Sequence, residues 1–189
     1  MKITAGKYKY RNIELPKGIR PTTGKVREAV LSMVTPWLDG AAVMDMFAGS
    51  GSLGLEALSR GAAHCYFSES SRSNTKVLIS NIAECGAGEV STVYNSDYQA
   101  AISKLEKLGI PMDIVFMDPP YEELSYYEKG MMMLQEAGLL DEGSLVVAEH
   151  LYDNKLSDTY GFLHRIKEKR YGSIGVDVYI YEKQHDETL

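Results

Sequence analysis

Two hydrophobic periods alternate through the middle of the chain. Short apolar runs, which are typical of buried strands, fall at 42–46, 63–69, 90–95, 112–117 and 144–149. The stretches between them carry apolar residues at helical spacing, at 52–59, 72–84, 98–108 and 124–137. Strands that alternate with helices in this way predict βαβ units, and therefore a parallel sheet with helices on both faces.

Both ends of the chain depart from this rhythm. Residues 163–170 and 175–182 alternate apolar and polar positions around Tyr171-Gly172-Ser173, which predicts an antiparallel hairpin at the sheet edge. Short strands are predicted at 2–5 and 10–15 around Gly6-Lys7. The amphipathic helix predicted at 24–37 places Trp37 on its core-facing side. We expect three parts: an N-terminal extension (1–23), one α/β domain (24–183) and a disordered tail (184–189).

The net charge of −6 is unevenly distributed along the chain. Residues 1–29 hold eight basic and two acidic residues, whereas the remainder holds 12 basic and 24 acidic ones. This division suggests a polyanion-binding arm on an acidic body, but on charge alone a solvated basic surface without a partner is an equal alternative. There is no membrane-length apolar run and no signal-peptide pattern, and the two cysteines are isolated. We therefore expect a cytoplasmic protein in a reducing compartment, with no membrane partner.

A glycine-rich loop follows the first predicted parallel strand. Gly49, Gly51 and Gly54 form a G-x-G-x-x-G pattern between that strand and a helix. In this context the glycines permit a tight turn and let a ligand approach the backbone closely. Glu69 ends the next strand, twenty residues after the first glycine, where a carboxylate can accept hydrogen bonds from both ribose hydroxyls. The pattern predicts an adenosine-containing ligand.

Two features favour S-adenosylmethionine over a dinucleotide as this ligand. Asp45 stands at the end of the first strand, where a carboxylate suits a cationic amino-acid group better than a pyrophosphate. A dinucleotide also needs a second mononucleotide-binding half, for which the chain leaves little length. Asp97, after the third strand, is predicted to accept the adenine amino group, to cap the next helix, or to do both.

The fourth parallel strand runs into Asp118-Pro119-Pro120-Tyr121. Chemistry in an open parallel sheet collects at the carboxyl ends of the strands. An exocyclic amine on a base is a poor nucleophile, because its lone pair is delocalised into the ring. The Asp118 carboxylate and a rigidly held Pro119 carbonyl can accept its two hydrogens, while Tyr121 stacks on a flipped base. The tetrapeptide therefore predicts methyl transfer to an amino group.

The tetrapeptide and glycine loop resemble the class I amino-methyltransferases that carry D/N-P-P-Y/F/W. The segments Ile3–Tyr8, Arg20–Thr23, Val26–Glu28 and Phe47–Gly61 are similar to one branch, the RsmD family of 16S rRNA guanine-N2 methyltransferases. This resemblance covers residues 1–183. It implies a Rossmann-like class I methyltransferase fold, with a mostly parallel seven-stranded sheet, an antiparallel C-terminal hairpin and a small N-terminal β-hairpin/helix extension.

The resemblance also implies a set of site residues. S-adenosylmethionine would bind Asp45, Phe47, Ala48, Gly49, Ser50, Gly51, Glu69 and Asp97, and catalysis would rest on Asp118, Pro119, Pro120 and Tyr121. Small-subunit rRNA would contact Lys7, Arg11, Arg20, Thr22, Thr23 and Arg27. The expected substrate is a guanine of that rRNA within an assembled or partly assembled 30S particle, and the enzyme is expected to be a monomer. A second candidate RNA surface consists of Arg165, Lys167, Lys169 and Arg170. The alternative is that these residues form a solvated strand face that binds no partner.

Other functions stay open at this point. They are an adenine-N6 methyltransferase, a protein-glutamine methyltransferase, a nucleotide-dependent oxidoreductase and a non-catalytic RNA module that binds S-adenosylmethionine. No metal site is expected, because the four histidines are scattered without ligand spacing.

Overall fold

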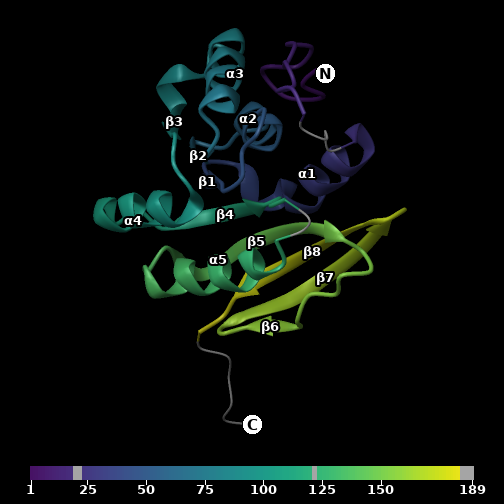
Figure 1. Ribbon diagram of the computed structural model, residues 1–189, viewed down its shortest axis with the longest axis vertical. Helices are drawn as coiled ribbons and strands as arrows, with labels where there is room; N and C mark the ends of the chain where they lie inside the picture. The colour runs from purple at the N-terminus through teal and green to yellow at the C-terminus, as the bar shows by residue number, and fades with distance from the viewer. Residues whose placement is uncertain (19–22, 121–122, 184–189) are drawn as a thin grey trace.

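The computed structural model describes residues 1–18, 23–120 and 123–183. Its centre is an eight-stranded sheet in the order β3-β2-β1-β4-β5-β8-β7-β6, which runs from top to bottom in Figure 1. The strands are β1 (Ala42–Asp45), β2 (His64–Ser68), β3 (Ser91–Tyr94), β4 (Met112–Met117), β5 (Leu140–Leu151), β6 (Thr159–Tyr160), β7 (Leu163–Tyr171) and β8 (Ile174–Tyr181). The first five pair in parallel, and β6, β7 and β8 are antiparallel. The predicted α/β class, the parallel sheet and the C-terminal hairpin are confirmed.

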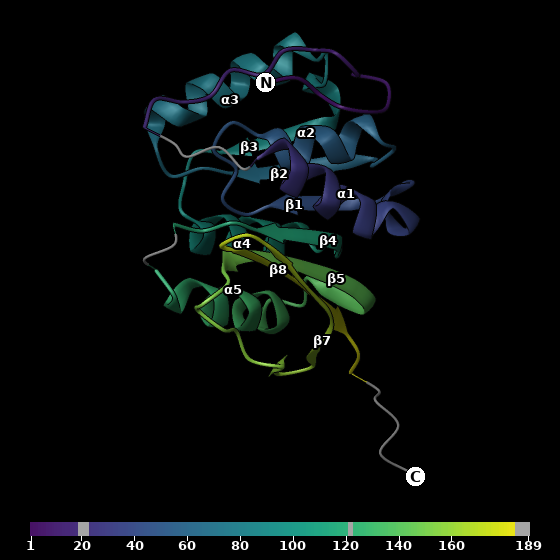
Figure 2. The same cartoon turned by 90° about the vertical axis from the view of Figure 1, so that its right-hand side faces the viewer.

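Helices cover both faces of this sheet (Figure 2). They are α1 (Gly24–Leu38), α2 (Ser52–Ser59), α3 (Arg72–Glu84), α4 (Tyr98–Leu108) and α5 (Ser125–Glu136), with a short 3-10 helix at Gly88–Val90. Apolar residues of α1, α2 and α3 share one core cluster, and those of α4 and α5 share the other. In β4, Ile114 and Phe116 face the first cluster while Val115 and Met117 face the second. A strand buried on both faces explains the continuous apolar run in its sequence. No helix in the described ranges combines the length and apolar character that crossing a bilayer requires.

Three expectations need correction. The N-terminal extension has an isolated bridge between Lys2 and Asn12 instead of strands at 2–5 and 10–15. Trp37 is 41% exposed and is not a core residue, because Val34 and Leu38 fill the buried stripe of α1. The sheet has eight strands rather than seven, since the two-residue β6 adds to its edge. The tail at 184–189 lies outside the described residues.

The N-terminal extension folds back on itself and packs on α2. Its two arms share backbone hydrogen bonds such as that from the Ile3 N–H to the Arg11 carbonyl at 3.0 Å. Other backbone groups bond to the helix: the Thr4 N–H donates to Glu56 at 2.7 Å, and the Lys7 N–H donates to the Ser59 carbonyl at 2.9 Å. Gly6 lies so close that a Cβ there would be 1.9 Å from the Ser59 carbonyl oxygen. The chain adopts a positive φ of 84° at Gly6, so both space and conformation require glycine.

Glu56 is the buried acid that holds this packing together. Its carboxylate is fully buried and lies 3.5 Å from the Arg27 guanidinium and 3.3 Å from that of Arg60. It also accepts hydrogen bonds from the Thr4 N–H and hydroxyl. Buried charges are tolerated when they are paired and hydrogen-bonded in this way. One carboxylate thus joins the extension, α1 and α2.

We predict that Glu56→Gln lowers the free energy of unfolding by about 3–5 kcal/mol, because it leaves the Arg27 guanidinium buried without a counter-charge. Urea denaturation followed by circular dichroism measures the change. The matched control is Glu89→Gln, an exposed acid, which is expected to change stability by less than about 0.5 kcal/mol. Equal stabilities for the two variants would contradict the assigned role of Glu56.

Candidate active site

A pocket of about 700 Å³ opens at the carboxyl ends of β1, β2, β3 and β4. The pocket gathers most of the predicted site residues, which come from four loops that are distant in sequence. They are Asp45, Phe47, Ala48, Gly49, Ser50, Glu69, Asp97, Asp118, Pro119 and Pro120. Tyr121 lies outside the described residues. Parallel pairing produces this convergence, because it carries the carboxyl ends of all four strands to one edge.

The three glycines of the loop have different structural roles. Gly49 and Gly51 adopt φ values of 55° and 84°, in the region that favours glycine. Gly51 is the N-cap of α2 and is not among the residues that line the pocket. A Cβ on Gly54 would lie 2.3 Å from the Phe67 ring, so this glycine allows α2 to pack on β2. Only Gly49 of the three lines the pocket directly; the others set the path of the loop.

Asp45 is a buried carboxyl group at the end of β1. It is 2% exposed and accepts a hydrogen bond from the Gly54 N–H at 3.1 Å. Burial raises its pKa from 3.8 to about 7; the nearby Glu69 carboxylate also raises it, and the Gly54 hydrogen bond opposes the shift. A carboxyl group in a cleft whose pKa is strongly raised by burial marks a candidate functional site.

Glu69 and Asp97 line the pocket from β2 and β3. The two Glu69 carboxylate oxygens accept from the Gly49 N–H at 2.9 Å and the Ser71 N–H at 2.8 Å. Each carboxylate oxygen can accept a second bond, so capacity for two ribose hydroxyls is left. Asp97 accepts from the Ala100 N–H at 2.8 Å and is the N-cap of α4, which confirms its predicted capping role. Its contact with adenine stays a prediction.

The structure adds two aromatic residues, Tyr98 and Tyr126, beside the predicted Phe47. Phe47 and Tyr126 lie nearly parallel, with ring centroids 5.7 Å apart and planes inclined by 10°. Tyr98 contacts both rings, at 5.4 Å and 5.3 Å between centroids. All three line the pocket that contains Asp118. Tyr126 is on α5 and is distant along the chain from Phe47 and Tyr98, so no local sequence pattern could have identified it as a pocket residue.

The N-terminal extension also forms part of the pocket wall. Met1, Leu15 and Gly18 line the pocket. The buried Asn81 of α3 ties this segment to the glycine loop: its amide nitrogen donates to the carbonyls of Glu14 at 2.9 Å and Ser50 at 2.8 Å. The segment predicted as an RNA arm is therefore also a structural neighbour of the glycine loop.

The predicted RNA-contacting residues are dispersed. Lys7 and Arg11 are both exposed. The Lys7 N–H donates to the Ser59 carbonyl, at the end of α2 that is farther from the glycine loop. Thr23 caps α1 by accepting from the Val26 N–H at 3.3 Å. Arg27 needs correction: it is 3% exposed and bound to Glu56, so its guanidinium is not available to a phosphate. Arg20 and Thr22 lie outside the described residues.

The raised pKa of Asp45 predicts a pH-dependent stability. Between pH 4 and 7 the native protein holds a proton on Asp45 that the unfolded chain has lost, so this group lowers the free energy of unfolding as pH rises. Asp45→Asn cannot titrate. The variant should therefore gain stability relative to the unmodified protein from about pH 4 to about pH 7, and the difference should level off above that range.

Urea unfolding at half-unit pH steps tests this expectation. Asp153→Asn, which removes an exposed carboxylate, is the control and should show no comparable trend. A stability difference for Asp45→Asn that does not vary with pH would contradict the assignment.

Comparison with known proteins agrees with this geometry. The family model described as conserved hypothetical protein 95 matches residues 1–180. The chain is 36% identical over 186 residues to the ribosomal RNA small subunit methyltransferase D of Escherichia coli (strain K12), covering 97% of this chain and 91% of the relative. It is 34% identical over 181 residues to YlbH of Bacillus subtilis (strain 168), covering 95% and 98%.

Solved structures support the same grouping. The Escherichia coli protein yhhF superimposes with a TM-score of 0.85 at 36% identity, covering 97% of this chain and 99% of that one. An RNA methyltransferase of Salinibacter ruber, solved with S-adenosyl-L-homocysteine, superimposes with a TM-score of 0.67 at 18% identity, covering 89% and 97%; this likeness shows the Rossmann-like fold alone. The chain therefore belongs to the conserved hypothetical protein 95 family, the RsmD family of S-adenosylmethionine-dependent rRNA methyltransferases.

Proposed function

We propose that the protein transfers a methyl group from S-adenosylmethionine to the exocyclic N2 amino group of a guanine in small-subunit rRNA. The observation that carries the proposal is that Asp118, Pro119 and Pro120 line the same pocket as Asp45, Glu69 and Asp97. An amine-binding loop thus faces a nucleoside-binding site across one cavity. The name of the Escherichia coli relative, a small-subunit rRNA methyltransferase, supports this substrate class.

The residues present fit S-adenosylmethionine. Asp45 offers a buried carboxylate for a cationic amino-acid group, and the Glu69 oxygens keep capacity for the ribose hydroxyls. Asp97 and Tyr98 flank the remaining side, where an adenine ring would meet an acid and an aromatic face. When bound, the cofactor supplies a methyl group on a positively charged sulfur.

The chain's own residues orient the acceptor amine. The Asp118 carboxylate and the Pro119 carbonyl accept its two N–H groups, which directs the nitrogen lone pair toward the methyl carbon. This nitrogen would receive the methyl group of the bound cofactor, and Asp118 would accept the proton that the methylated amine loses and pass it to water. The two prolines hold the acceptors rigid, so positioning supplies most of the acceleration. Tyr121 is proposed to stack on the target base.

RNA contacts are proposed at the basic extension, through Lys7, Arg11, Arg20, Thr22 and Thr23. Such contacts with phosphates position a substrate without reading its sequence. A second basic surface lies at the carboxyl end of β5, because Leu151 pairs with Ile174 and brings the turn between β7 and β8 to that edge. There Lys155 and Arg170 flank the Tyr152 ring, 3.4 Å and 4.2 Å from its centroid.

Within the 165–170 cluster, Arg165 is engaged inside the protein. It lies 3.3 Å from Asp177 and 3.4 Å from Glu168, and it also pairs with Asp158. Lys167, Lys169 and Arg170 are exposed. Of these, Arg170 lies against the Tyr152 ring beside Lys155, so it is the residue of this cluster that we assign to RNA. We further propose that the enzyme acts as a monomer on an assembled or partly assembled 30S particle. Ribosomal proteins of the particle would enlarge the contact area, which is small if the N-terminal extension alone binds the RNA.

Transfer of labelled methyl to three acceptors tests the proposed function: small ribosomal subunits from a strain that lacks the modification, bulk DNA and total protein. Label recovered as N2-methylguanosine from the subunits is the expected result. Label in N6-methyladenosine or in glutamine would replace the proposal with the corresponding alternative reaction. Cofactor binding without any transfer would favour a non-catalytic module.

Asp118→Ala is predicted to reduce methyl transfer by about 100-fold or more while the affinity for the cofactor is retained. The reason is that Asp118 holds the acceptor amine of the base and does not contact the nucleoside part of the cofactor. Single-turnover transfer and calorimetric binding measure the two quantities. The control is Asp141→Asn, an exposed acid on β5 that should alter neither. Full activity of Asp118→Ala would refute the proposed role.

Lys7→Gln and Arg11→Gln are each predicted to reduce the slope of log binding constant against log salt concentration by about 1, as expected for the loss of one phosphate contact. Binding to small-subunit particles over a range of salt concentrations measures the slope. Lys107→Gln, at the end of α4, is the control with the same change in charge. An unaltered slope in both extension variants would place the RNA elsewhere.

A further inference from the structure

Lys129 of α5 is a cation on the wall of the pocket that contains Asp118. Among the described residues that line this pocket, it is the only lysine or arginine. The other charged side chains of that lining are the acids Asp45, Glu69, Asp97 and Asp118. Lys129 is exposed, and it takes part in none of the ion pairs within the described ranges. Its ammonium group is therefore available to a negatively charged ligand.

The helix approaches the catalytic edge at Gly130, the residue after Lys129. A Cβ on Gly130 would lie 2.7 Å from the Met117 Cε and 3.3 Å from the Met46 Sδ. Met117 is the last residue of β4 and directly precedes Asp118. Glycine thus lets α5 lie against the end of β4, and this close packing puts Lys129 beside the loop that holds Asp118.

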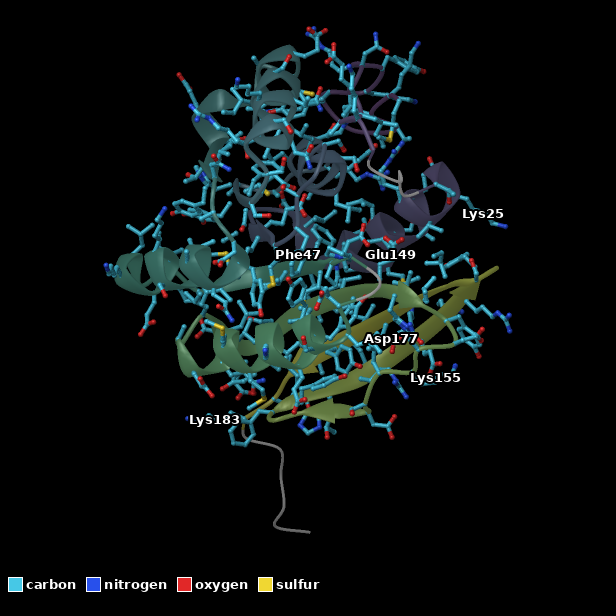
Figure 3. The ribbon with its side chains drawn as sticks, viewed as in Figure 1. Lys25, Phe47, Glu149, Lys155, Asp177 and Lys183 are labelled. Carbon is cyan, nitrogen blue, oxygen red and sulfur yellow. The ribbon has the colours of Figure 1, made fainter. Side chains whose placement is uncertain are left out.

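The first turn of α5 is fixed in the same place. Tyr126 stacks with Phe47, which Figure 3 shows beside this helix, at 5.7 Å between ring centroids. Burial, and after it the charge of Asp118, raise the pKa of Tyr127, so the Asp118 carboxylate lies close to this turn. Residues three apart share one side of a helix, which explains why Tyr126 and Lys129 line the pocket together.

Two anions meet at this pocket in the proposed reaction: the carboxylate of the cofactor and the phosphates of the RNA. The cofactor carboxylate is on the same carbon as the amino group that we assign to Asp45, a residue that is 2% exposed. Lys129 is exposed, so its position suits a ligand that stays partly outside the pocket. The target nucleotide is such a ligand, because its base reaches Asp118 while the acids of the pocket repel its phosphates toward the mouth.

We infer that Lys129 is a substrate-binding residue that holds one of the two phosphates flanking the target guanosine while the base lies against Asp118. This inference rests on the proposed function. An ammonium group is a compact charge with three donors, and it binds phosphate through charge-assisted hydrogen bonds. The phosphate is joined to its base through the sugar, so a phosphate fixed at the mouth restricts how the amine approaches Asp118.

A neutral methylphosphonate in place of each flanking phosphate isolates this contact. Once the methylated guanosine is located, particles are prepared with a phosphate or a methylphosphonate on its 5′ or its 3′ side. Both members of each pair carry a 2′-deoxy sugar at that linkage, so that they differ in charge alone. The unmodified enzyme should lose about 10–100-fold in kcat/KM at one of the two positions, as expected for a charge-assisted hydrogen bond.

Lys129→Gln should lower kcat/KM by about tenfold or more for the phosphate substrate. For the methylphosphonate substrate at the sensitive position the loss should be less than about twofold, because the contact is already absent there. Lys129→Arg keeps the positive charge and should retain most of the preference for phosphate. Lys107→Gln, on the neighbouring helix α4, makes the same change in charge and should leave the preference unaltered.

The ratio between the paired substrates is the decisive measurement, since a merely structural role of Lys129 would lower both activities together. An unmodified enzyme that is indifferent to both replacements overturns the inference, and so does a Lys129→Gln variant that keeps the full preference for phosphate. A weaker affinity of that variant for the cofactor, with an unchanged ratio, also overturns it and assigns Lys129 to the cofactor carboxylate. In each case the reaction stands, whereas failure of the unmodified enzyme to form N2-methylguanosine overturns the proposed function itself.

Discussion

The parallel register of β1, β2 and β4 is the constraint on which the site depends. Asp45 pairs with Phe67 on one side and with Phe116 on the other, so the three strands end nearly level. Each strand contributes an acid to the edge: Asp45 is the last residue of β1, and Glu69 and Asp118 directly follow β2 and β4. Asp45 is 2% exposed although the pocket opens at this edge, and this burial raises its pKa to about 7. Sheet geometry therefore sets the electrostatics of the pocket before any ligand arrives.

The N-terminal extension shows how formal charge can mislead. The sequence assigns six net positive charges to residues 1–29, but Arg27 is buried against Glu56 and does not reach solvent. Glu56 lies in an apolar stretch of α2, where a helix pattern gives no sign that an acid faces inward. The free positive charge of the extension is therefore smaller than the composition suggests, and part of its role is to complete the pocket wall.

Much of the fold followed from periodicity, because hydrophobic spacing depends on local geometry. The strand predicted at 112–117 has the observed bounds of β4, and the glycine loop lies between a strand and a helix as expected. The errors concern long-range packing. Trp37 has helical spacing that suits the core, but neighbouring side chains fill that space. Tyr126 reaches the pocket only because α5 packs beside the glycine loop, and no local pattern encodes that contact.

The distribution of charge along the carboxyl edge suits a reaction between a cation and a polyanion. On the proposed reaction, the acids after β1, β2 and β3 attract a cofactor whose sulfur is positively charged, and this attraction weakens once methyl transfer leaves the sulfur neutral. The same acids repel phosphates, so an RNA backbone is kept away from the pocket. On the same proposal, Lys155, which also pairs with Glu168 at 3.1 Å, and Arg170 lie past β5, where they would neutralise phosphates while an uncharged base enters. The edge thus separates backbone from base by charge, and discrimination among bases is left to groups that the base alone can reach.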